Sequence, residues 1–282
     1  MSETASAGVR FFEGLWRGVL IGYGIVLLVL ALGFATQAPW ATVFWPWPDG
    51  RLTYWVIGAI LAAIGAPIIW IGASGELAAM RAGALDLALS MLGITGYLIW
   101  IYQPPAGQPP LLPYVATVSI GILANLILFL VSQNLAFRDR RPLPSLARWS
   151  FLLFAVSLIG VGGALLWQYP TIFPWPLKPE SSVLMGWIFL GAAVYFLYGF
   201  FAPSWANGCG QLLGFLAYDL VLIMPLVNHL TVVKDAHQLS LFVYLAVLGY
   251  SGLLAIYFLF LHPATRFGGE QPAPALAAGS MA

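Results

Sequence analysis

Eight long runs of apolar residues, separated by short polar or proline-rich segments, dominate the pattern of this chain. They cover roughly 15–36, 53–75, 83–102, 113–136, 149–168, 182–202, 208–229 and 239–262. A helix that crosses a bilayer needs about 20 mostly apolar residues, whereas strands of a membrane barrel would alternate over about 10 residues. The pattern therefore predicts an all-α integral membrane protein with eight transmembrane helices.

The composition supports lipid as the solvent of these helices. Charged residues make up 7% of the 282 residues, hydrophobic residues make up 61%, and the mean hydropathy is +0.90. A soluble protein carries about 25% charged residues. The net charge of +1 argues against binding of nucleic acid. The predicted partner is the lipid bilayer, and a membrane protein partner or a homo-oligomer is left open.

The ends of the helices carry an uneven distribution of Lys and Arg, which predicts orientation. With eight spans both termini share a side, and a cytoplasmic assignment of that side places most basic residues inside. The polar, acidic start "MSETASAGVRFFEG" favours a retained first helix over a signal peptide. We therefore expect a plasma (inner) membrane protein with both termini cytoplasmic. The inside residues are Arg10, Arg17, Arg81, Arg138, Arg140, Arg141, Arg148 and Arg266, against Arg51, Lys178 and Lys234 outside.

One unusual phrase occurs twice, as "VFWPWPDG" at 43–50 and "IFPWPLKP" at 172–179. At the spacing of 128 residues that aligns the two Pro-Trp-Pro triplets, Gly58 also falls on Gly186. Further on, "LDLAL" at 85–89 matches "YDLVL" at 218–222. We expect two tandem four-helix repeats of the same orientation. The predicted divisions are a repeat at 1–136, a basic cytoplasmic linker at 137–144, a repeat at 145–265 and a disordered tail at 266–282.

The two repeated phrases supply aromatic residues to short turns at the predicted outer face. Phe44 and Trp47 belong to the first turn, and Phe173 and Trp175 belong to the second. Aromatic rings favour the headgroup layer, and proline stiffens a short connection. We expect interfacial anchors in rigid turns, and the alternative is a pair of binding loops that line an outer cleft.

The stretch "FPWPLKPESSVLMGWIFLG" at 173–191, followed by histidines within 228–237, resembles a group of uncharacterised bacterial multi-pass membrane proteins. Members of that group carry an FPW-x-x-x-P segment, a Gly-Ala-Trp-like helix and a short outer loop with histidine. The similarity covers about sixty residues of the second half, and Ala236 stands where the group has an aromatic residue. The resemblance implies a multi-pass architecture and no particular activity.

One polar stripe stands out within the predicted seventh helix. Asp219 lies near its middle, and Gln211 and Asn207 share its face at helical spacing. A charged group at the centre of a bilayer costs roughly 2.5–3.5 kcal/mol on insertion scales. The stripe is therefore a candidate intramembrane site, and the alternative is a hydrogen-bonded Asp that joins the two repeats. Asp86 is the counterpart of Asp219 in the first repeat, near the inner start of its helix.

Few other residues suggest chemistry. His229, Asp235 and His237 lie in one outer loop, and the two histidines are weak candidates for binding a metal, but the H-x5-D-x-H spacing matches no metal motif. We expect no metal, no cofactor and no catalytic residue, because few ionisable groups could share acid and base roles. The sequence favours a non-catalytic membrane component over an enzyme. The alternative is a permease-like or channel-like transporter with a path near Asp219.

Overall fold

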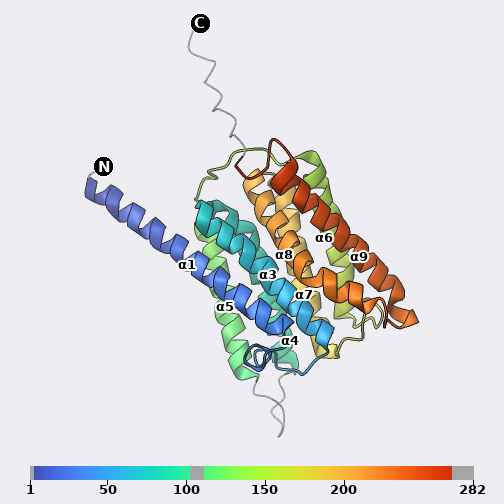
Figure 1. Cartoon of the computed structure of the whole chain (residues 1–282). Helices are drawn as coiled ribbons and strands as arrows, with labels where there is room; N and C mark the ends of the chain where they lie inside the picture. The colour runs from blue at the N-terminus through green and yellow to red at the C-terminus, as the bar shows by residue number, and fades with distance from the viewer. Residues whose placement is uncertain (1–2, 102–110, 269–282) are drawn as a thin grey trace.

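The computed structural model describes residues 3–101 and 111–268, and within them the chain is helical almost throughout (Figure 1). Eight helices in this part are long and apolar enough to cross a membrane, which confirms the predicted number of spans. The disordered tail predicted at 266–282 lies mostly outside the described residues. The elements are α1 (Glu3–Ala35), α2 (Pro39–Thr42), α3 (Arg51–Ser74), η1 (Leu77–Ala79), α4 (Met80–Ile101), α5 (Leu112–Ser132), α6 (Ser145–Leu166), α7 (Pro179–Phe201), α8 (Trp205–His229), α9 (Asp235–Ile256) and η2 (Tyr257–Leu261).

The connections gather at two ends of the helical bundle. Segments 36–50 and 167–178, which contain the repeated phrases, lie at one end, called here the loop end (Figure 1). The linker 137–144 lies at the opposite end, called here the linker end. The two phrases therefore lie on the same face of the molecule.

The eight helices pack as two groups of four that do not follow the order of the chain. Helix α1 packs on α3, α3 on α8 and α8 on α9, and we call these four the terminal bundle. Helix α6 packs on α7, α7 on α4 and α4 on α5, and we call these the middle bundle. Consecutive helices α3 and α4, like α7 and α8, have little close backbone packing. The interface between the two bundles is called the seam.

Small residues bring backbones together inside each bundle. In the terminal bundle, a Cβ added at Gly58 would lie 2.7 Å from the carbonyl oxygen of Ala31. In the middle bundle, a Cβ at Gly162 would lie 3.1 Å from the carbonyl oxygen of Gly186. Lipid supplies no hydrophobic drive for helix association, so close van der Waals packing of this kind holds the helices together.

Large aromatic side chains fill the seam instead. Phe215 of α8 stacks on Phe196 of α7 with ring centroids 4.5 Å apart, and it lies 4.4 Å from Phe154 of α6. Tyr250 of α9 shares a hydrogen bond with Ser150 of α6, with 2.6 Å between the oxygens. The seam is thus built from side chains, whereas the interiors of the bundles bring backbones into contact.

Two glutamines follow the C-terminal ends of α1 and α6 in the same backbone conformation. Gln37 follows α1 with φ of 55°, and Gln168 follows α6 with φ of 56°. This left-handed conformation closes a Schellman motif, which usually takes glycine. The bonds match in both places: Gln37 N–H to Phe34 O, Ala38 N–H to Gly33 O, Gln168 N–H to Leu165 O and Tyr169 N–H to Ala164 O.

Two arginines cap helix ends at the linker end. Arg17 of α1 donates through Nε to the carbonyl of Gly72 at 2.8 Å, near the C-terminus of α3. Arg148 of α6 donates through Nε to the carbonyl of Phe200 at 3.0 Å, near the C-terminus of α7. The last carbonyls of a helix have no partner within it and carry partial negative charge, so a guanidinium there stabilises the end.

The close contact of α6 with α7 at Gly162 leads to a first prediction. Gly162→Val should lower the free energy of unfolding by about 2 kcal/mol, because the new side chain would press on the backbone of α7. Gly163→Val is the matched control, since a Cβ there meets nothing within 4 Å. Thermal unfolding of both variants in one detergent measures the difference. Equal melting temperatures would contradict the packing described above.

Candidate functional site

Two of the predicted polar residues of α8 bind backbone carbonyls near the linker end. Asn207 is 2% exposed and donates through Nδ2 to the carbonyl of Ala202 at 2.9 Å. Gln211 is fully buried and donates through Nε2 to the carbonyl of Tyr195 on α7. A side chain at Gly199 of α7 would collide with Gln211. Gln211 therefore forms a direct polar contact across the seam.

The two intramembrane aspartates each bind a serine inside their own bundle. Asp219 of α8 is 6% exposed, and its Oδ2 accepts a hydrogen bond from Ser251 of α9 at 2.8 Å. Asp86 of α4 accepts from Ser90 of the same helix at 3.2 Å, beside Gly191 of α7. The four predicted residues thus use four different partners. Asp219 faces α9, whereas Gln211 faces α7.

Three acceptor oxygens of α8 are buried without a donor among the described residues: Asn207 Oδ1, Gln211 Oε1 and Asp219 Oδ1. Thr95 Oγ1 of α4 is likewise buried without a hydrogen-bond partner among the described residues. Buried polar atoms nearly always have a hydrogen-bond partner, and exceptions ask for an explanation such as water or a ligand. Donors from water or from a solute would satisfy these oxygens.

A carboxylate that the sequence analysis did not single out joins the two bundles at the loop end. Asp49 precedes α3, and its Oδ1 accepts from Thr53 Oγ1 at 3.1 Å and from the Gly50 N–H at 2.6 Å. Its Oδ2 accepts from Ser181, in the first turn of α7. Trp175 Nε1 donates to Thr53 Oγ1 at 3.1 Å. We call Asp49, Thr53, Trp175 and Ser181 the clasp.

The two histidines predicted in the outer loop belong to its flanking helices instead, His229 as the last residue of α8 and His237 in the first turn of α9, and both contact backbone groups. His237 is 8% exposed, and its Nδ1 lies 2.8 Å from the carbonyl oxygen of Phe173. His229 Nε2 lies 3.1 Å from the carbonyl oxygen of Pro174. Within the described part of the chain, His, Cys, Asp and Glu form no group of three that could hold a metal ion. The histidines fasten the second aromatic–proline loop to α8 and α9.

The two aromatic turns differ in their surroundings. Phe44 is 61% exposed and Trp47 is partly buried. Phe173 and Trp175 are 1% and 6% exposed and belong to the core between the bundles. The first turn therefore exposes aromatic surface, whereas the aromatic rings of the second turn are buried in this core.

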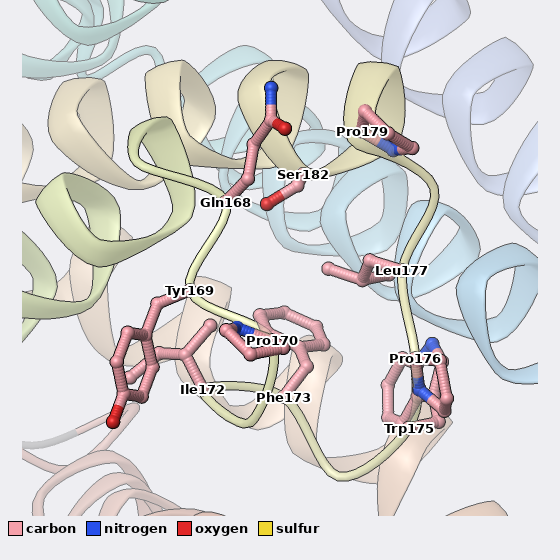
Figure 2. Close-up of a pocket in the computed structure, with 10 residues that line it drawn as sticks. All are labelled: Gln168, Tyr169, Pro170, Ile172, Phe173, Trp175, Pro176, Leu177, Pro179 and Ser182. Carbon is pink, nitrogen blue, oxygen red and sulfur yellow. The ribbon is translucent and has the colours of Figure 1, made fainter.

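A cavity of about 160 Å³ lies within the second loop (Figure 2). The loop curves around it, with Tyr169 and Ile172 on one side and Trp175 and Leu177 on the other. Ser182 also reaches it, but its hydroxyl already donates to the carbonyl of Leu165. The cavity is mostly apolar and adjoins the clasp through Trp175.

No protein family, curated protein or solved structure matches this chain. Its own fold and contacts therefore define its class. The chain is a multi-pass α-helical membrane protein with eight helices able to span a bilayer among its described residues.

The clasp generates a second prediction. Trp175→Phe should lower the free energy of unfolding by about 1–2 kcal/mol, because it keeps an aromatic ring but removes the hydrogen bond to buried Thr53. Trp45→Phe is the control, since Trp45 Nε1 is buried without an acceptor among the described residues. Denaturation in detergent compares the two. An equal loss in both variants would show that the Trp175 hydrogen bond contributes nothing.

Proposed function

We propose that this chain is a non-catalytic membrane component whose polar side chains hold helices and loops in place. The carrying observation is the use of its histidines and of two partly buried arginines: His229 and His237 bind loop carbonyls, and Arg17 and Arg148 cap helix ends. An acid–base or nucleophilic catalyst directs two polar groups at one reacting atom. The contacts of these two histidines and two arginines run from single side chains to separate backbone groups.

We further propose that α1–α5 and α6–α9 are two tandem repeats of the same orientation. Two sets of matching positions support this proposal. Gln37 and Gln168, like Arg17 and Arg148, lie 131 residues apart and make the same contacts. Gly58 and Gly186, 128 residues apart, approach the first helix of their own repeat. The excess of arginine near the linker end supports cytoplasmic termini and the plasma membrane as the location.

The structural role of the histidines can be tested by replacements that keep the donor. His237→Asn places an amide nitrogen near the position of Nδ1 and should retain stability and function. His237→Leu should cost about 1–3 kcal/mol, because it leaves the carbonyl of Phe173 unpaired. Melting temperature in detergent and complementation of a deletion strain are the measurements. A folded Asn variant that fails to complement would contradict the proposed role.

A second candidate function is a permease-like or channel-like protein with a path near Asp219. The donor-free oxygens on α8 favour it, because a solute with N–H or O–H donors, or a cation, could satisfy them in turn. They lie on one helix, from Asn207 near the linker end to Asp219 further along. The solute class that fits is therefore small and donor-rich or positively charged.

This candidate predicts a specific pattern of substitutions. Neither Asp219→Asn nor Asp219→Leu should restore the growth of a deletion strain, which the wild-type protein restores. The free energy of unfolding of the Asp219→Asn variant should stay within about 1 kcal/mol of that of the wild type. Ser251→Ala removes the partner of the carboxyl and serves as the structural control, which should still complement. Membrane insertion, stability in detergent and growth are measured in parallel. Full tolerance of Leu in all three assays would eliminate a path at Asp219.

A further inference from the structure

The chain crosses between the two bundles only at one end of the molecule. Helix α3 of the terminal bundle leads to α4 of the middle bundle through 75–79, and α7 leads back to α8 through 202–204. Both crossings lie at the linker end (Figure 1). The other connections join helices of the same bundle. At the loop end, therefore, the seam is held by side chains alone.

The crossings at the linker end have the features of a hinge. Gly75 ends α3 in the left-handed region with φ of 75°. The buried carboxylate of Glu76 accepts the backbone N–H groups of Arg138 and Asp139 at 2.8 and 3.0 Å. These bonds fix the linker against the first crossing. Hinges are a few residues at element ends that absorb a change in backbone angles while packed bodies move intact.

The contacts inside each bundle and across the seam differ in the way that such a motion requires. Backbones meet at Gly58 in the terminal bundle and at Gly162 in the middle bundle, so each bundle resists deformation. Across the seam, aromatic rings such as Phe196 and Phe215 meet face to face. Side chains of this kind can separate without breaking backbone hydrogen bonds.

Asp49 lies at the loop end, where no described connection of the chain crosses the seam. Its Oδ1 holds the first turn of its own helix, α3, through Thr53, while its Oδ2 reaches across the seam to Ser181 of α7. A carboxylate is favoured at helix N-termini. The N-terminal turns of both α3 and α7 bind the carboxylate of Asp49. Release of Ser181 and of the Trp175 hydrogen bond would free α3 from the middle bundle at the loop end and leave the cap of α3 intact. His229 and His237 would still hold the second loop to α8 and α9.

We propose that the terminal and middle bundles open as two bodies at the loop end, about a hinge at the linker end, and that Asp49 is the latch on the α3 side of this opening, while His229 and His237 fasten the α8 and α9 side. The motion would expose the seam, including its apolar core, from the loop side. Its purpose rests on the permease-like candidate, since rocking of one bundle against another is how many transporters expose a site. The motion itself is measured without any solute, so its failure is separate from the failure of that function.

The experiment compares one thiol at each end of the seam. Cys209, the chain's single cysteine, is 1% exposed near the linker end. Val56→Cys, combined with Cys209→Ser, places a thiol at a fully buried position of α3 near the loop end. A water-soluble maleimide is added to open membrane fragments, and the labelling rate of each thiol is followed. Adding Asp49→Ala should raise the rate at position 56 about tenfold and change the rate at Cys209 by less than twofold.

Two further variants make the result decisive. Asp235→Ala removes an exposed carboxylate at the start of α9 and should change neither rate. Among the described residues, the Asp235 carboxylate bonds the side chain of Gln238. Ser181→Ala breaks only the bond across the seam and leaves Asp49 on α3, so it should repeat the pattern if Asp49→Ala fails to insert. Equal acceleration at both thiols would indicate general loosening and overturn the hinge. Unchanged labelling at position 56 would overturn the latch.

Discussion

The apolar solvent around these helices is the constraint on which the rest of the structure depends. Lipid tails are as apolar as leucine, so helices gain little from hiding apolar surface against one another. Association must come from close contact and from hydrogen bonds. Gly58 and Gly162 supply the contact by letting backbones approach, and Arg17 and Arg148 supply hydrogen bonds to helix ends that would otherwise be unpaired.

The same constraint explains why the bundles differ from the halves of the chain. A helix packs on whichever neighbour offers matching small residues, regardless of its place in the sequence. Helix α7 approaches α4 at Gly191, and α8 approaches α3 at Gly214. Each bundle thus combines helices from both proposed repeats. Bulky rings around Phe215 fill the space that remains, and they form the seam.

The polar groups of the interior fall into two kinds. Asp49, Glu76 and His237 have partners that fix loops or the linker. Asp219 has one bonded carboxyl oxygen and one without a donor among the described residues. Gln211 has a bonded amide nitrogen and an amide oxygen without a donor there. The first kind accounts for the shape of the molecule, and the second kind is where a solute or water would act.

The number and length of the spans were determined by the sequence alone, because the thickness of hydrocarbon sets a minimum apolar run. Helical spacing likewise placed Asn207, Gln211 and Asp219 near one side of α8. Only the tertiary structure decided that Gln211 meets α7 while Asp219 meets α9. It also decided that Phe173 is buried and Phe44 exposed, although their phrases match, and that Asp49 binds Ser181 from the other bundle. Those outcomes depend on which helices become neighbours, and a local pattern of residues carries no information about neighbours distant in the chain.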